Sequence, residues 1–218
     1  MNEIRHIVFD IGKVLMEWDP NYVYRRLIPD DGERQHFLTH VCSAEWNLEQ
    51  DRGRTWPEAE AALIVQYPEH EALIRAFRKD WAEMAPHHFP DTLAIRDRLL
   101  AQGWDVTALT NFASDTFDEA RALYPFLDAF RGITVSAAVG LVKPEIAIYR
   151  HHAKTFGLDP AATLFFDDNP ANVDGARAAG WNAELFTSAD QMRTDLARYG
   201  VDLGAVDEVD PKSSEASR

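Results

Sequence analysis

The stretch LFFDDNPANVDGARAAG, residues 164–180, is the part of this sequence that most strongly indicates a fold. It opens with an apolar run typical of a buried strand, and two acids, Asp167 and Asp168, follow at once. Pro170 then favours the first turn of a helix, and Gly180 is suited to end that helix. A strand, an acidic turn and a helix therefore follow one another within a few residues, as in a parallel sheet whose strands are joined by helices.

The same alternation continues on both sides of this stretch. We predict strands at residues 4–9, 105–109, 132–135, 163–166 and 182–186, and helices at residues 91–102, 114–124, 144–156, 170–179 and 188–199. Strands that alternate with helices form a parallel sheet with helices on both faces. The predicted fold class is therefore α/β, with a doubly wound, Rossmann-like parallel sheet.

Residues 17–87 interrupt this pattern with helical periodicity and without strand-like alternation. The predicted helices cover residues 22–28, 33–41, 55–67 and 69–84. We therefore expect a core of residues 1–16 and 88–204, with residues 17–87 inserted after the first strand as a small helical cap. An insert at the carboxyl end of a strand lies over the place where ligands bind, as a lid does. The polar residues 205–218 are predicted to be a disordered tail.

The composition limits the classes of partner. Lys and Arg number 22 against 36 Asp and Glu, a formal net charge of −14, which argues against nucleic acid or an anionic membrane as a partner. The one cysteine, Cys42, excludes an intrachain disulfide and a Cys-rich zinc site. We see no signal-peptide pattern and no apolar run approaching about 18 residues. We therefore expect a cytoplasmic protein, either a monomer or a homodimer.

Polar residues follow three of the predicted strands directly. Asp10 comes after the first strand, Thr110 and Asn111 after the second, and the pair Asp167 and Asp168 after a later one. Open α/β sheets bind ligands at the carboxyl ends of their strands. The sequence therefore predicts that these side chains meet in one site.

The residue types at this edge are suited to phosphate chemistry. The carboxylate of Asp10 is a usable nucleophile toward phosphorus or an activated carbon. Thr110 and Asn111 precede a predicted helix and form a reasonable cradle for phosphate oxygens. Lys143, in GLVKPE, precedes a proline that fixes the entry to the next helix, and its compact charge suits a phosphate or a carboxylate nucleophile.

The adjacent acids Asp167 and Asp168 indicate a cation. They repel each other unless one is present, and Mg²⁺ takes oxygen ligands of this kind; a double helix cap is the alternative interpretation. The backbone at Gly12 turns sharply enough for its carbonyl to approach a ligand. Asn172, in the first turn of the following helix, could orient an aspartate.

Four segments, VFDIGKVL, ALTN, GLVKPE and FFDDNPANVDGARAAGW, resemble the four motifs of the haloacid dehalogenase (HAD) superfamily and cover nearly the whole chain. The helical insert resembles that family's type-1 cap. The resemblance implies that Asp10 is both the nucleophile and a Mg²⁺ ligand, and that the Gly12 carbonyl is a second ligand. It further implies that Asp168 binds the metal directly, with Asp167 beside it or acting through water. The phosphoryl oxygens would be held by Thr110, Asn111 and Lys143.

One position departs from the family pattern. Phosphatases of this family usually carry a second aspartate two residues after the nucleophile, as general acid and base, and here that position is Gly12. General acid–base help is worth roughly 10²–10⁴ in rate. The glycine variant resembles a subgroup close to the bacterial glucose-1-phosphate phosphatases. Lys13, Asp19 or a substrate hydroxyl are alternative proton donors.

The predicted cap is expected to select the substrate. Trp18 and Asp19 lie where a short flap would face the site. Trp46, Asn47 and Arg52, in AEWNLEQDRG, are interpreted as part of a specificity loop, with Trp46 stacking on a sugar or closing a pocket.

The leading hypothesis is a Mg²⁺-dependent phosphatase that hydrolyses a small phosphorylated metabolite, with sugar phosphates among the candidates, through an aspartyl-phosphate. A metal-independent 2-haloacid dehalogenase is one alternative, because halide leaves without a proton. The paired acids argue against it, since a pair of vacant buried carboxylates costs several kcal/mol. A non-catalytic binding protein of the same shape is the other alternative.

Overall fold

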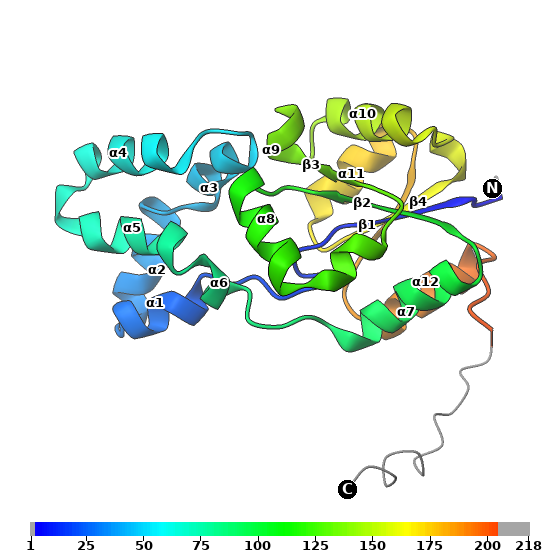
Figure 1. The fold of residues 1–218 in the computed structure, drawn as a ribbon, viewed down its shortest axis with the longest axis horizontal. Coiled ribbons are helices and arrows are strands. Elements are labelled where there is room, and N and C mark those ends of the chain that lie inside the picture. The colour runs from blue at the N-terminus through cyan, green and yellow to red at the C-terminus, as the bar shows by residue number, and fades with distance from the viewer. Residues whose placement is uncertain (1–2, 205–218) are drawn as a thin grey trace, which may run out of the picture.

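The computed structural model describes residues 3–204, so the predicted tail at residues 205–218 lies outside the described residues. Within them, five parallel strands form one sheet in the order β3-β2-β1-β4-β5 (Figure 1). The strands are β1 (His6–Phe9), β2 (Asp105–Thr110), β3 (Ile133–Val135), β4 (Thr163–Asp167) and β5 (Asn182–Leu185). Strand β1 lies at the centre of the sheet, which confirms the predicted doubly wound α/β class.

Helices cover both faces of this sheet. They are α7 (Pro90–Ala101), α8 (Ser114–Leu123), α9 (Ser136–Val139), α10 (Ile146–Phe156), α11 (Pro170–Ala178) and α12 (Ala189–Arg198). Their bounds agree with the predicted helices to within two residues, and the short α9 was not predicted. Because side chains alternate along a strand, neighbouring residues of β1 face different helices.

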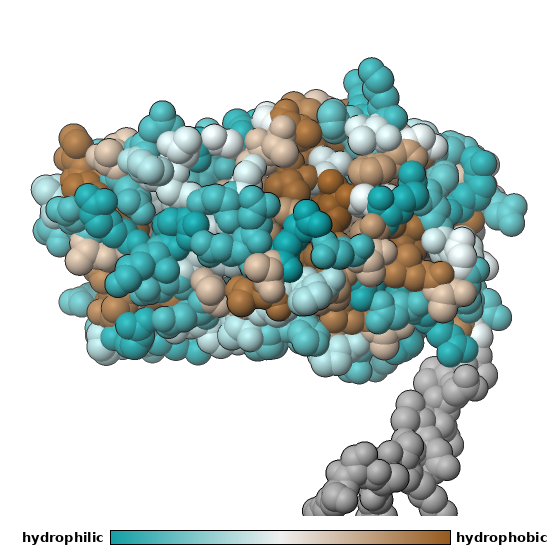
Figure 2. Space-filling view, viewed as in Figure 1, coloured by the Kyte–Doolittle hydropathy of each residue, from teal (hydrophilic) through white to brown (hydrophobic). Residues whose placement is uncertain are grey.

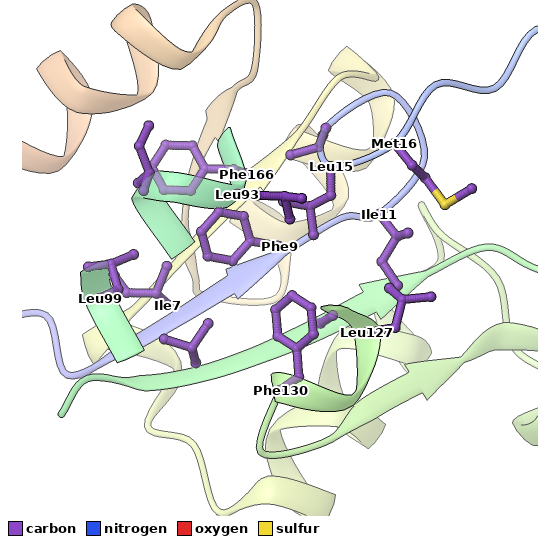
Figure 3. Close-up of a cluster of buried hydrophobic side chains, with 14 of the residues drawn as sticks. Ile7, Phe9, Ile11, Leu15, Met16, Leu93, Leu99, Leu127, Phe130 and Phe166 are labelled. Carbon is purple, nitrogen blue, oxygen red and sulfur yellow. The ribbon is translucent and has the colours of Figure 1, made fainter. Parts of the chain in front are cut away.

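One face of the sheet carries the largest apolar cluster. Ile7 and Phe9 of β1 and Phe166 of β4 pack there against Leu93 and Leu99 of α7 (Figure 3). The ring centroids of Phe9 and Phe166 are 6.1 Å apart. Burial of this much apolar surface fixes the register of the strands.

The opposite face has its own cluster. Val8 of β1 and Phe165 of β4 pack there against Tyr149 of α10 and Val173 of α11. The two clusters cover both faces of the sheet at β1, so this strand is accessible only at its ends. The carboxyl ends of the central strands are thus the part of the sheet that is open to a ligand.

Residues 21–84 form a separate group of helices, which we call the helical unit (Figure 1, left). It comprises α1 (Asn21–Leu27), α2 (Asp31–His40), α3 (Ala44–Asp51), α4 (Trp56–Gln66), α5 (Glu71–Lys79) and α6 (Trp81–Met84). It has an apolar cluster of its own, in which Tyr24, Phe37 and Phe77 are buried. Thr55 and Glu58 form a capping box at the start of α4, where we expected a helix to begin.

Two expectations for this unit are wrong. The segment interpreted as a specificity loop is helix α3, whose N-cap Ser43 accepts a hydrogen bond from the Trp46 N–H. The helix predicted at residues 69–84 is a 3₁₀ turn followed by α5 and α6, and the chain bends at Asp80. Helix α3 is short and has no clear apolar stripe, so its sequence does not indicate a helix, whereas the apolar positions of α5 and α6 follow each other without a glycine or proline to mark the bend.

Two antiparallel segments join the helical unit to the sheet. The Glu17 N–H donates to the His87 carbonyl over 2.9 Å, and the Phe89 N–H donates to the Leu15 carbonyl over 2.9 Å. Residues 15–17 and 87–89 therefore form a two-stranded connection between the helical unit and the sheet, near the carboxyl end of β1.

Hydrophilic residues predominate on the face shown in Figure 2, with hydrophobic residues gathered mainly toward its middle. No helix among residues 3–204 has the length and apolar character needed to cross a membrane.

Candidate active site

The ends of three neighbouring strands bring the predicted residues together. In the sheet Phe9 is paired with Ala108 of β2 on one side and with Phe166 of β4 on the other. Asp10 follows Phe9, and its N–H still donates to the Phe166 carbonyl over 2.9 Å. Because β1 lies between β2 and β4, the side chains of Asp10, Thr110 and Asp167 emerge at the same edge.

Lys143 links two of these carboxylates. Its Nζ lies 2.7 Å from Asp10 Oδ1 and 2.7 Å from Asp167 Oδ2. All three side chains are buried, and Lys143 is only 2% exposed. An ammonium shared by two carboxylates at this depth is held in one position, because loss of either contact would leave a buried charge unpaired.

The loop that carries Lys143 is fixed by two further contacts. Asn111 Oδ1 accepts from the Lys143 N–H over 2.8 Å, and Asn111 Nδ2 donates to the Lys143 carbonyl over 3.0 Å. Gly175 of α11 packs so closely that a Cβ built on it would lie 2.4 Å from the Pro144 carbonyl oxygen. The glycine in this motif therefore allows α11 to approach the lysine loop.

Asp167 is engaged on both of its oxygens. It accepts from the Asn169 N–H over 2.8 Å and from Asn172 Nδ2 over 2.9 and 3.1 Å, in addition to Lys143. Asn172 thus lies where it orients this aspartate. Asp168 is less buried and lines the cavity described below, as does Gly12.

The three acids fit a divalent cation. Asp10, Asp167 and Asp168 each offer a carboxylate oxygen, and these oxygens lie within 4.8 Å of one another. Three carboxylates face two ammonium groups, Lys143 between Asp10 and Asp167 and Lys13 near Asp168, so negative charge is in excess at this edge. Burial raises the pKa of Asp10 to about 7 against the opposing effect of Lys143, and burial also raises the pKa of Asp168. A divalent cation among these oxygens would supply the missing positive charge.

A cavity of about 220 Å³ adjoins these groups and extends toward the helical unit. Its polar wall comes from the sheet edge and includes Thr110 and Asn111. A second group of lining residues is aromatic and comprises Trp18, Trp56, Trp81 and Phe112, which we call the aromatic wall. The cavity is therefore lined by both charged and aromatic groups.

The predicted substrate-binding residues divide into two groups. Trp18 and Asn47 line the cavity, whereas Asp19, Trp46 and Arg52 do not belong to its lining. Each of the latter three has a structural partner. Asp19 accepts from the N–H and side-chain amide of Asn21, both over 2.8 Å.

The other two residues outside the lining are held in a similar way. The ring of Trp46 packs edge-on against Phe77, with centroids 5.3 Å apart. Arg52 lies 2.8 Å from Glu145, in an ion pair between the helical unit and the segment that precedes α10.

Sequence reasoning missed Asp51, which lines the cavity from the end of α3. Asn47 and Asp51 are one helical turn apart, and Asn47 Nδ2 lies 3.3 Å from Asp51 Oδ2. Had residues 44–51 been predicted as a helix, this i,i+4 spacing would have placed both side chains on one face. Trp56, Trp81 and Phe112 were missed because a buried aromatic residue has no sequence signal that separates a pocket wall from a core.

Asp51 is also tied to the sheet domain. The Ala113 N–H donates to its carboxylate, and Ser136 Oγ donates to its backbone carbonyl over 2.5 Å. Burial raises the pKa of Asp51 to about 7, and the charge of Lys143 opposes that rise.

The sequence matches the model of the haloacid dehalogenase-like hydrolases over residues 4–180. The sesquiterpene phosphatase astK of Aspergillus oryzae is 30% identical over 176 residues, which cover 79% of this chain and 85% of that protein.

Two solved structures share the fold. One is a HAD family enzyme from Bacteroides thetaiotaomicron in complex with magnesium and inorganic phosphate, with a TM-score of 0.63, 20% identity and coverage of 84% of this chain and 94% of that chain. The other is the L-2-haloacid dehalogenase from Xanthobacter autotrophicus with chloropropionic acid covalently bound, with a TM-score of 0.61, 20% identity and coverage of 89% and 83%. Since the family model matches most of the sequence, including all the strand-end residues described above, the chain belongs to the haloacid dehalogenase-like hydrolases.

Proposed function

We propose that this protein is a Mg²⁺-dependent phosphatase that hydrolyses a phosphate monoester through an aspartyl-phosphate on Asp10. The observation that carries this proposal is the cluster of three carboxylate oxygens within 4.8 Å of one another, with Lys143 bridging two of the acids. A dehalogenation site has no need of such a cluster, whereas a phosphoryl group bound beside Asp10 requires positive charge around it.

The residues of the chain divide the work as follows. Asp10 attacks phosphorus, and Lys143 holds the carboxylate in place and faces the phosphoryl oxygens. Asp167, fixed by Asn172, keeps Lys143 charged and oriented. Thr110, which is buried and lines the cavity, offers its hydroxyl and the start of the following turn to the phosphoryl group.

Asp10, the Gly12 carbonyl and Asp168 would hold the cation, with Asp167 behind them. When bound there, a divalent cation neutralises charge on the phosphoryl oxygens and polarises phosphorus for attack. The raised pKa of Asp10 fits this role, because a carboxylate that is costly to ionise alone is stabilised beside such a cation.

The aromatic wall supports an apolar alcohol as the leaving group. Trp18, Trp56, Trp81 and Phe112 contribute apolar rings to the lining, whereas a sugar would need each of its hydroxyls paired on burial. The indole N–H of Trp56 is already bonded to Asp115 over 3.0 Å. The relative named as a sesquiterpene phosphatase is consistent with this preference. Among small phosphorylated metabolites, the aromatic residues of the lining thus favour monoesters of apolar alcohols over sugar phosphates.

The test is a panel of phosphate monoesters with sugar, aryl and long alkyl alcohols, assayed for phosphate release with Mg²⁺ and with a chelator. We expect turnover that needs the metal and is lost by at least about 10⁴-fold in Asp10→Asn, because an amide cannot form the aspartyl-phosphate. The exposed acid variant Asp174→Asn serves as the matched control and should retain full activity. Metal-independent turnover, or activity in Asp10→Asn, would contradict the proposal; halide release from 2-chloropropionate with chelator present would favour dehalogenation.

A further inference from the structure

We propose that Asp51 of α3 is the proton donor to the leaving oxygen, a role left open at Gly12. This inference rests on the proposed phosphatase function. It assigns a catalytic residue to the helical unit, at a position far in sequence from the strand-end motifs.

The position of Asp51 in the cavity fits this role. Attack by Asp10 in line with the departing oxygen puts that oxygen on the side of phosphorus away from the sheet edge. The helical unit forms that side. Among the described residues that line the cavity, Asp51 is the one acid contributed by the helical unit; Asp10 and Asp168 belong to the sheet edge.

Hydrogen bonds hold the carboxyl group of Asp51 in one orientation. Asn47 Nδ2 lies 3.3 Å from Oδ2, and the Ala113 N–H, at the end of the loop after β2, donates to the same carboxylate. The Ser136 hydroxyl donates to the Asp51 carbonyl over 2.5 Å and accepts from the Phe112 N–H over 2.9 Å. The backbone of Asp51 is thereby joined to the loop that begins with Thr110 and Asn111.

The environment favours a carboxyl that exchanges its proton near neutral pH. Burial is the largest influence and raises the pKa of Asp51 to about 7, whereas Lys143 and the Ala113 N–H lower it. A general acid works best when its pKa lies near the working pH. Asp51 meets this condition together with the geometric one.

The step is balanced as follows. The Asp10 carboxylate forms a bond to phosphorus while the bond from phosphorus to the ester oxygen breaks, and the Asp51 proton passes to that oxygen to give the neutral alcohol. Asp51 is then a carboxylate. When water attacks the aspartyl-phosphate, Asp51 takes one of its protons, phosphate leaves, and both acids return to their starting forms.

The experiment compares two leaving groups in single turnover, with enzyme in excess and Mg²⁺ present. An alkyl phosphate needs a proton to release its alcohol, whereas p-nitrophenyl phosphate releases a stable phenolate without one. In Asp51→Asn we expect alcohol release from the alkyl ester to slow by roughly 10²–10⁴-fold and nitrophenolate release to change by less than about 3-fold. Glu49→Gln, an acid-to-amide change at an exposed site on the same helix, should alter neither rate.

Multiple turnovers of p-nitrophenyl phosphate, with substrate in excess, provide a second test of the same role. Because the same residue activates water, Asp51→Asn should give a burst of about one nitrophenolate per enzyme followed by a slow phase. An equal loss on both substrates in the first turnover would show that Asp51 acts only through structure, and no loss on the alkyl ester would also overturn the proposal.

A second substitution, at Gly12, tests whether an acid placed elsewhere can restore activity to Asp51→Asn. A Cβ built on Gly12 would meet no atom within 4 Å, and its φ is not in the left-handed region. A side chain can therefore begin without a clash at the position where other phosphatases of the family carry their acid. We expect Gly12→Asp to restore at least 10-fold of the alkyl-ester rate to Asp51→Asn; absence of rescue with an intact burst would count against a proton-transfer role.

The wild-type protein provides a measurement that does not depend on a variant folding. Across aryl phosphates of rising phenol pKa, a proton donor keeps the release rate nearly constant, and a steep fall would contradict the proposal. Failure of the proposed function itself is distinguishable, because the wild type would then release neither alcohol nor nitrophenolate.

Discussion

The two walls of the cavity are built on different principles. At the sheet edge, each functional group is held by several others: Lys143 by two carboxylates and by Asn111, and Asp167 by Asn172. The helical unit contributes two aromatic rings, Trp56 and Trp81, together with Asn47 and one acid, Asp51. The comparison teaches that the groups at the sheet edge depend on one another, whereas the aromatic residues can vary without disturbing those charges; on the proposed function, the first group would set the chemistry and the second the choice of alcohol.

The largest effect is expected from removal of the central charge. Lys143→Met leaves Asp10 and Asp167 buried without their shared cation, so we expect the free energy of unfolding to fall by about 3–5 kcal/mol and phosphatase activity to be lost. Urea unfolding at neutral pH measures the first and phosphate release the second. Lys154→Met, a change of an exposed lysine on α10, is the control. A fall in stability below about 1 kcal/mol would show that the charges at the sheet edge are not interdependent.

The second prediction concerns the aromatic wall. Trp18→Ala removes a ring face from the cavity, so kcat/KM for an alkyl phosphate should fall roughly 10–100-fold, which corresponds to about 1.5–3 kcal/mol of lost apolar contact. Competitive inhibition by inorganic phosphate, which reaches only the charged wall, should stay within about 2-fold. If both change together, the two walls do not act separately.

The third prediction concerns the pH dependence of stability that follows from the burial of His152. This residue lies on the face of the sheet opposite the largest cluster. His152 is buried between the hydroxyls of Thr107 and Thr134, at 3.0 and 2.8 Å, and burial lowers its pKa from 6.5 to about 3. A depressed histidine pKa stabilises the fold above pH 6.5, and this contribution is lost as the pH falls toward about 3. We expect a loss of about 2 kcal/mol between about pH 6.5 and about pH 4.5.

The variant His152→Gln should lack this part of the acid sensitivity, whereas His151→Gln should keep it. Urea unfolding at a series of pH values for the three proteins provides the measurement. Identical pH dependence in all three would mean that His152 is not held neutral by the fold.

The smallest effect is expected for Arg52→Gln. Arg52 pairs with Glu145 at a partly exposed site and does not line the cavity, so the free energy of unfolding should change by less than about 0.5 kcal/mol. We expect kcat/KM for every ester of the panel to remain within about 2-fold. A large rise in KM would restore the substrate-binding role that the sequence suggested.

The sheet and its edge were predictable because their signals are local. Apolar runs that end in Asp10, Thr110 and Asp167 report a buried strand and its carboxyl end together, and parallel pairing then leaves few arrangements. The helical unit was less predictable, since Trp46 and Trp56 both pack in its apolar cluster, yet only Trp56 also lines the cavity. Only tertiary packing separates the two cases.

The hydrogen bond from Ser136 to the Asp51 carbonyl fixes the end of α3 to the sheet domain. Any swing of α3 away from the sheet must break this bond and the contact of Ala113 with the Asp51 carboxylate, and it carries the proton source away with the moving helix. The anchor of α3 to the sheet domain and the proposed proton donor thus share one helix end, so a movement that frees this end would also remove the donor from the cavity.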